Sequence, residues 1–151
     1  MNNFKEIAGQ TITDILEKAA FIFTDTLDAN QKPSLRTWEA EGVSLRFSGN
    51  TSGTVYMWVS NGFACFVAAN MLGIEKENEK AKEKGIDALK ELLNMIVGNL
   101  LTAIFGEEPV FELGLPTSMD HSELEKNENN PDSVWLQAEG NPIFFIMKID
   151  G

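Results

Sequence analysis

Cysteine and histidine are nearly absent from this sequence, with one of each in 151 residues. Cys65 therefore has no partner for an internal disulfide, and its apolar surroundings, GFACFVAANML, predict a small buried hydrophobic residue. A nucleophilic thiol needs a neighbouring base, but His121 stands in an acidic, polar stretch that predicts a solvated loop. A zinc site needs further histidines or cysteines at short spacing. The sequence thus indicates neither thiol nor zinc chemistry.

Positive charge is also scarce. Lysine and arginine number 12 against 23 aspartates and glutamates, which gives a net charge of -11 and a pI of about 4.5. Nucleic acids are bound through clustered lysines and arginines, and anionic membrane surfaces attract the same residues. Because this chain is so acidic, we expect neither nucleic acid nor membrane among its partners.

Long hydrophobic runs are missing too. No stretch of 18 or more apolar residues is present, and the first residues, MNNFKEIAGQT, lack the basic and apolar regions of a signal peptide. With 43% hydrophobic and 23% charged residues, the composition is typical of a globular protein, and the length suits one domain over residues 1–151. We therefore expect a single cytoplasmic domain.

Familiar catalytic signatures are absent as well. The sequence has no glycine-rich phosphate loop of the P-loop or Rossmann type and no serine, histidine and aspartate set. Any chemistry must therefore come from residues that look ordinary one by one.

Apolar periodicity, in contrast, is clear along most of the chain. Recurrence every three or four residues predicts helices, and strict alternation on both sides of a turn cluster predicts β-hairpins. The predicted elements are a helix over residues 4–25, a hairpin over 43–60, a short helix over 61–73 that ends at Gly73, a long helix over 87–105 with a charged lead-in, and a second hairpin over 133–150.

The connecting segments are polar or contain proline. Residues 26–42 and 118–133 predict loops, and residues 106–119 can supply a short strand. The turn of the second hairpin is expected at Gly140, Asn141 and Pro142.

The two predicted hairpins share the pattern V-x-L-x-x-x-G-N, in VSLRFSGN from Val43 and in VWLQAEGN from Val134. Each copy leads into an apolar strand, VYMWV or IFFIM, and a long helix precedes each hairpin. The repeat predicts an α+β domain in which duplicated helix-plus-hairpin units pack long helices on one antiparallel β-sheet.

The long helix carries polar residues among its aliphatic ones. At about 100° per residue, its apolar face comprises Leu89, Leu92, Leu93, Ile96, Val97, Leu100, Ala103 and Ile104. The opposite side carries one continuous stripe within about 60° of arc, formed by Asp87, Glu91, Asn94 and Gly98.

A solvated helix face is the plain interpretation of this stripe. Gly98 argues against it, because glycine costs about 1 kcal/mol in a helix interior relative to alanine. Its missing side chain would let a partner come close. Met95 and Leu101 flank the stripe and resemble the apolar rim of a docking surface. Asn99 lies at the border of the apolar face, and we expect it to bond a neighbouring loop or helix.

The stretch from Ala69 to Met119, with ANMLGIE, DALKELLNMIVGNL and LGLPTSM, resembles the CheC/CheX/FliY phosphatases of bacterial and archaeal chemotaxis. The active-site pattern of that family is Asp or Ser, three residues, Glu, two residues, Asn, and a proline about 22 residues further on. Asp87, Glu91 and Asn94 match this pattern in identity and spacing. Pro116 follows after 21 residues, one short of the pattern.

The first predicted helix resembles the second only in part. In TDILEKAAFIF, Glu17 matches the glutamate, but Ala20 stands where the asparagine would be. One complete motif per chain is the CheX-like arrangement, whereas CheC-like members often carry two. The resemblance further implies a homodimer in a prokaryotic cytoplasm.

The resemblance also implies the chemistry. The substrate would be a phosphorylated CheY-like response regulator, and the reaction would be hydrolysis of its aspartyl phosphate. Asn94 would position the attacking water, and Glu91 would pair with the active-site lysine of the receiver. The partner would be contacted by Asp87, Met95, Gly98 and Leu101. This chain would bind no cofactor, because Mg²⁺ is expected on the receiver domain.

Two alternatives stay open at this point. The chain can be a non-catalytic CheX-like module that binds receivers or serves as a scaffold, although the presence of both Glu91 and Asn94 argues against this. It can also be an unrelated α+β domain whose helix carries a fortuitous stripe.

Overall fold

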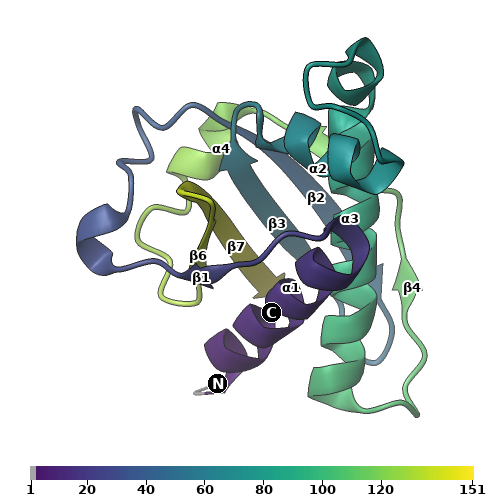
Figure 1. Ribbon diagram of the computed structural model, residues 1–151. Coiled ribbons are helices and arrows are strands. Elements are labelled where there is room, and N and C mark those ends of the chain that lie inside the picture. Colours follow the sequence, from purple (N-terminus) through teal and green to yellow (C-terminus); the bar gives the residue numbers. More distant parts are fainter. Residues whose placement is uncertain (1–2) are drawn as a thin grey trace.

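The two hairpins predicted from the sequence pair with each other inside one antiparallel sheet (Figure 1). The computed structural model describes residues 3–151. The strands of the hairpins are β2 (Ala40–Ser48), β3 (Gly53–Ser60), β6 (Val134–Ala138) and β7 (Asn141–Ile149). Met57 of β3 lies opposite Phe145 of β7, so the apolar strands of the two repeats are neighbours. The predicted α+β fold with a duplicated plan is confirmed.

Short strands from each half of the chain pair with the hairpin of the other half. These strands are β1 (Asp25–Thr26), β4 (Glu112–Leu113) and β5 (Thr117–Met119). β1 belongs to the first half but pairs with β6, and β5 belongs to the second half but pairs with β2. The order is β1-β6-β7-β3-β2-β4, with β5 also on β2. The halves therefore exchange their edge strands.

The turn of the second hairpin lies one residue earlier than predicted. Glu139 and Gly140 form it, with φ values of 50° and 80°. Asn141 and Pro142 instead begin β7, where they pair with β6. A two-residue turn with positive φ at both positions matches the right-handed twist of the flanking strands, which explains the shift.

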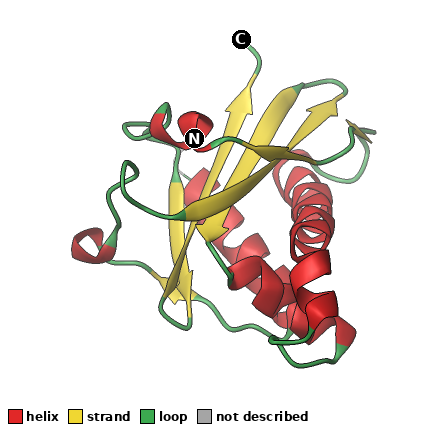
Figure 2. Ribbon diagram, turned by 90° about the horizontal axis from the view of Figure 1, so that it is seen from above, coloured by secondary structure: helices red, strands yellow, loops and turns green. Residues whose placement is uncertain are grey.

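Three helices cover one face of the sheet (Figure 2). They are α1 (Phe4–Ala20), α2 (Phe63–Leu72) and α3 (Glu79–Phe105). α2 ends at Gly73, as predicted, with a φ of 69°. α1 ends five residues earlier than predicted, because Phe21 adopts a left-handed conformation with a φ of 56°. The charged lead-in is itself helical: Asn78 caps α3 by accepting a hydrogen bond from the Lys80 amide at 2.9 Å.

α3 is also long and apolar enough, by length and composition, to cross a membrane, although no uninterrupted apolar run is present. Its apolar residues are buried against the sheet and the other helices, as Leu92, Leu93 and Ile96 illustrate with no exposed surface. Core helices of globular domains share this property, so the finding is explained by the fold.

Part of the far face of the sheet is covered by a segment that the sequence predicted to be a loop. It contains a short helix, α4 (His121–Glu125), and a second buried cluster lies beneath it. The cluster comprises Leu35, Trp38, Trp58, Leu124, Phe144 and Ile146. His121 is not simply solvated, since its Nε2 lies 2.9 Å from the carbonyl oxygen of Trp38. A 3-10 turn, η1 (Ala29–Gln31), interrupts the other predicted loop. Cys65, predicted to be buried, is half-buried.

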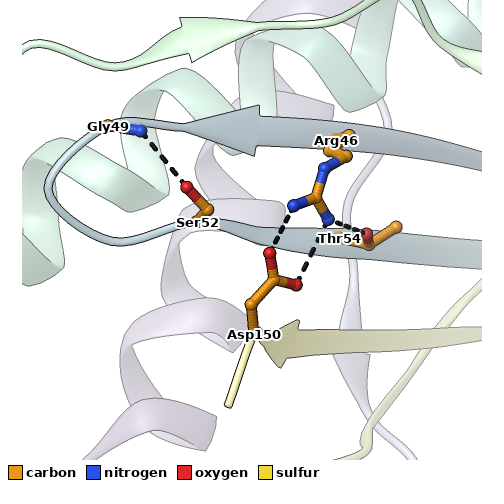
Figure 3. Close-up of polar contacts among 5 residues, drawn as sticks. All are labelled: Arg46, Gly49, Ser52, Thr54 and Asp150. Atoms are coloured by element: carbon orange, nitrogen blue, oxygen red, sulfur yellow. Dashed lines mark hydrogen bonds and ion pairs between the residues drawn. The ribbon is translucent and has the colours of Figure 1, made fainter.

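A polar cross-link ties three strands together on this far face (Figure 3). The guanidinium of Arg46 on β2 donates to both carboxylate oxygens of Asp150, just beyond β7, and to the hydroxyl of Thr54 on β3. This hydrogen bonding lowers the pKa of the Asp150 carboxyl. The pair is exposed, so its contribution to stability is small and is screened by salt. Its main effect is to fix Arg46 in position.

Candidate functional site

The predicted stripe on α3 faces solvent. The side chains of Asp87, Glu91 and Asn94 are exposed, and Gly98 continues the same line at the helix surface. The opposite side of the helix is buried through Leu89, Leu92, Leu93, Ile96, Val97 and Leu100. A helix with such a broad buried face is held firmly against the sheet, so the stripe is presented on a rigid element.

Glu91 and Asn94 have no partner within the described part of the chain. From Gly85 to Phe105, two side chains of α3 form hydrogen bonds within the described residues. The amide of Asn99 donates to the carbonyl of Met95 at 2.8 Å, and the hydroxyl of Thr102 donates to the carbonyl of Gly98 at 3.2 Å. The carboxylate of Glu91 and the amide of Asn94, three residues apart, therefore keep their hydrogen-bonding capacity for another molecule.

Asn99 behaves differently from the prediction. It was expected to bond a neighbouring loop or helix, yet it is exposed and its amide donates back to its own helix. Asn94 and Asn99 are thus two exposed amides on one helix, and within residues 3–151 only Asn99 has an intramolecular partner.

Gly98 has no packing reason among the residues that the structure describes. A methyl group added at its Cα would meet nothing within 4 Å. The space above the stripe is open at this point, and the glycine is not required by any neighbour in the described fold. Met95, on the other border of the stripe, is half-buried and packs partly against the main core.

Leu101 corrects the predicted docking surface. It was expected beside the stripe and in contact with a partner, but only 2% of its surface is exposed. After Gly106 the chain turns back along this side of α3, and the ring of Phe111 lies 5.4 Å from that of Phe105. Phe111 and Leu113 join the same core as Leu101. Leu101 is therefore a core residue. Ala103, predicted on the apolar face, is exposed instead.

The returning segment contains a β-bulge. In β4, Leu113 lies opposite Phe47, whereas in β5, Thr117 lies opposite Ser44. The amide of Gly114 donates to the carbonyl of Arg46 at 2.7 Å. Two residues, Leu115 and Pro116, therefore oppose the single residue Leu45. The one short strand that the sequence predicted is in fact two, separated by this bulge, and Pro116 lies at the position where an edge strand tolerates proline.

The equivalent surface of α1 does not repeat the stripe. Glu17 is exposed, but Ala20, at the position of the asparagine, is fully buried. The helix ends there, and the Ala20 carbonyl accepts a hydrogen bond from the Asn70 side chain.

The stripe lies on the solvent-facing surface of α3. One hollow of about 630 Å³ lies between α1 and the β1–β6 edge, with Gly9, Thr13 and Trp135 in its lining. Within residues 3–151, no group of three or more histidine, cysteine, aspartate or glutamate side chains is arranged to hold a metal ion. Small molecules prefer concave sites, so the stripe suits a macromolecular partner.

Comparison with protein families bears on what that partner is. The family model described as chemotaxis phosphatase CheX matches residues 42–139, about two thirds of the chain. This chain belongs to the CheX family. The matched region contains α2, the whole of α3 with its stripe, the bulge and β6. The resemblance noted from the sequence is thereby confirmed.

Solved structures share the CheX-like fold over nearly the whole chain. A chain of the CheX-CheY-BeF3-Mg²⁺ complex from Borrelia burgdorferi is 19% identical with a TM-score of 0.68, over 97% of each chain. CheX from Vibrio vulnificus is 15% identical with a TM-score of 0.67, over 97% of this chain and 96% of that one. FliY from Thermotoga maritima is 13% identical with a TM-score of 0.56, over 95% and 87%. No curated protein gives a significant match.

Proposed function

We propose that this protein is a phosphatase that hydrolyses the aspartyl phosphate of a phosphorylated CheY-like receiver domain. The observation that carries the proposal is the pair Glu91 and Asn94, exposed and without partners in the described chain, on the rigid α3 of a CheX family member. A structurally similar chain comes from a complex of CheX with CheY, BeF3 and Mg²⁺, which supports a receiver as the partner.

The proposed reaction needs few catalytic groups from this chain. An aspartyl phosphate is an activated acyl phosphate, and the receiver holds the phosphoryl group with its own Mg²⁺ and lysine. Hydrolysis then needs a water molecule held in line with the leaving carboxylate. The amide of Asn94 can accept a hydrogen bond from that water and donate one to it. Holding the water in place contributes proximity and orientation without a strong base.

Glu91 has a separate task in this proposal. One turn from Asn94 on the same face, its carboxylate pairs with the active-site lysine of the receiver. The pair sets the register of docking, so that Asn94 reaches the phosphoryl group. Asp87 adds negative charge at the near end of the stripe, and the bare backbone of Gly98 and the side chain of Met95 give the receiver room and contact.

Assembly and location follow the same proposal. We propose a single domain over residues 1–151 that forms a homodimer in the cytoplasm and binds no cofactor of its own. Sedimentation at micromolar concentration tests the dimer, and a monomer there would contradict it.

A direct test measures loss of ³²P from phosphorylated receiver domains of the host. The wild type should accelerate the loss, and Asn94→Ala should abolish the acceleration while remaining folded. Asn99→Ala is the matched control, because it removes an exposed amide from the same helix on a different side. Asn99→Ala should keep full activity. If no receiver loses phosphate faster with the wild type, the proposed function is wrong. Binding without acceleration would favour a non-catalytic receiver-binding module.

A further inference from the structure

We propose that Leu115, at the β-bulge beside α3, is an apolar contact residue that determines affinity for the receiver domain, an inference that rests on the function proposed above. Leu115 is 89% exposed, the highest value among the exposed large hydrophobic residues of the described chain. A single exposed leucine is ordinary on a protein surface, so the exposure of Leu115 becomes informative only through its position at an anchored bulge beside the stripe.

The bulge explains why Leu115 is exposed. Phe111 and Leu113 alternate toward the helix side of the sheet and pack on the core, so regular alternation would bring Leu115 to the same side. Ser118 lies opposite the inward-facing Val43, and alternation backward from it also places Pro116 on the helix side. Two residues thus compete for the space opposite Leu45, and Leu115 is the one that projects into solvent.

Both sides of the bulge are anchored. On one side the Gly114 amide bonds the carbonyl of Arg46 at 2.7 Å, and the side chain of Arg46 is itself tied to β3 and β7 (Figure 3). On the other side the hydroxyls of Ser44 and Thr117 lie 3.1 Å apart. Leu115 is therefore held on a fixed backbone, and ordering it on binding costs little entropy.

The lengths of two chain paths place the bulge at the level of Asn94. The returning segment starts from the contact between Phe105 and Phe111 and runs back beside α3 (Figure 1). From Phe105 to Asn94 the helix rises about 16 Å, and from Phe111 to the bulge the extended chain covers about 13–17 Å. Because the two paths run in opposite directions from a shared contact, they bring the bulge alongside the turn of α3 that carries Asn94.

The negative charge around Leu115 favours one kind of binding partner. Leu115 borders a stripe with two carboxylates on a chain of net charge -11. Such a surface repels an anionic membrane and a second copy of the same acidic face, but suits a partner that presents a lysine next to apolar surface. Leu115 and the stripe then form one interface: an apolar contact that excludes water beside the polar pair that does the chemistry.

The test compares Leu115→Ala with Val110→Ala. Val110 is a good control because it is 81% exposed in the same returning segment, but near the β2–β3 turn at the far end of α3. Both variants should keep the thermal unfolding midpoint of the wild type. Binding is titrated against host receiver domains carrying BeF3 and Mg²⁺, and kcat and KM are measured with phosphorylated receiver.

We expect Leu115→Ala to weaken binding and raise KM about tenfold, with kcat unchanged, and Val110→Ala to match the wild type. If the wild type binds and dephosphorylates a receiver and Leu115→Ala equals it in both assays, this inference is overturned while the proposed function stands. If the two variants lose affinity equally, the site is not specific to the bulge and the inference is also overturned. If the wild type neither binds nor dephosphorylates any receiver, both are overturned.

Discussion

The side-chain amide of Asn70 donates a hydrogen bond to the carbonyl oxygen of Ala20 at 2.9 Å and joins the end of α1 to α2. Ala20 stands where α3 has Asn94, and it is fully buried. The two long helices of the duplicated plan therefore differ at the position where we propose that Asn94 acts. In α3 the asparagine faces solvent, and in α1 the equivalent position is closed over.

Restoring the motif in α1 should not restore a site. Ala20→Asn places an amide in a filled, buried position, so we expect the free energy of unfolding in urea to fall by about 1–3 kcal/mol. In an Asn94→Ala background, this variant should regain no phosphatase activity. Recovered activity would mean that α1 can present the residue, contrary to the burial seen here.

Reversing the charge of Glu91 should act on docking. Glu91→Lys should raise KM for phosphorylated receiver about 10-fold or more, because it sets a lysine against the lysine of the receiver. The exposed position implies unchanged folding. Raising the ionic strength should weaken wild-type binding, so that the affinities of the wild type and Glu91→Lys become more similar. An unchanged KM would remove the assigned role of Glu91, while leaving that of Asn94 untouched.

Gly98 should show a conflict between stability and activity. Gly98→Ala should stabilise the protein by about 0.5–1 kcal/mol, since an added methyl meets open space. The same methyl should hinder the receiver and lower kcat/KM. Gly9→Ala in α1 is the matched control, because there too an added methyl meets nothing within 4 Å. It should stabilise without loss of activity. Equal activity in both variants would argue that Gly98 is not at the interface.

Glu41 should make stability depend on pH. Burial raises the pKa of its carboxyl, and a hydrogen bond with the backbone of Gly62 lowers it less. The pKa of Glu41 is therefore higher in the folded protein than in the unfolded chain. Its contribution to stability is fully present below the unfolded-state pKa and is lost as the pH rises through the folded-state pKa. Glu41→Gln should therefore raise the thermal midpoint at pH 7, with a smaller gain near pH 4. Glu39→Gln is the control, because Glu39 is exposed, and it should leave the thermal midpoint unchanged at both pH values. A gain for Glu41→Gln that is equal at both pH values would contradict the linkage between the Glu41 pKa and stability.

Local patterns in the sequence were sufficient for much of the fold and for the polar stripe. Alternation of Val43, Leu45 and Phe47 predicted β2, and the helical spacing around Glu91 and Asn94 placed both on the exposed side of α3. These features depend on periods of two and 3.6 residues, which neighbouring residues alone determine. Gly73 marked the end of α2 for an equally local reason, since glycine adopts positive φ readily.

Features that depend on distant segments could not be predicted in this way. The helical wheel placed Leu101 near the stripe, but whether it is exposed depends on which distant segments pack against that side of the helix. The bulge at Leu115 depends on how two short strands align with β2, which no period in the sequence records. The contact of His121 with Trp38 spans 83 residues and belongs to the same class.

The pairing of β3 with β7 has a consequence for how the protein is made. β3 needs β7 as its neighbour, and residues 61–140 must be synthesised between these two strands. At about 5–20 residues per second, the nascent chain carries β3 with an unpaired apolar edge for about 4–16 s. An open edge of this kind pairs readily with other chains. During translation, this protein is thus most exposed to aggregation after its first hairpin has formed and before its last strand has left the ribosome.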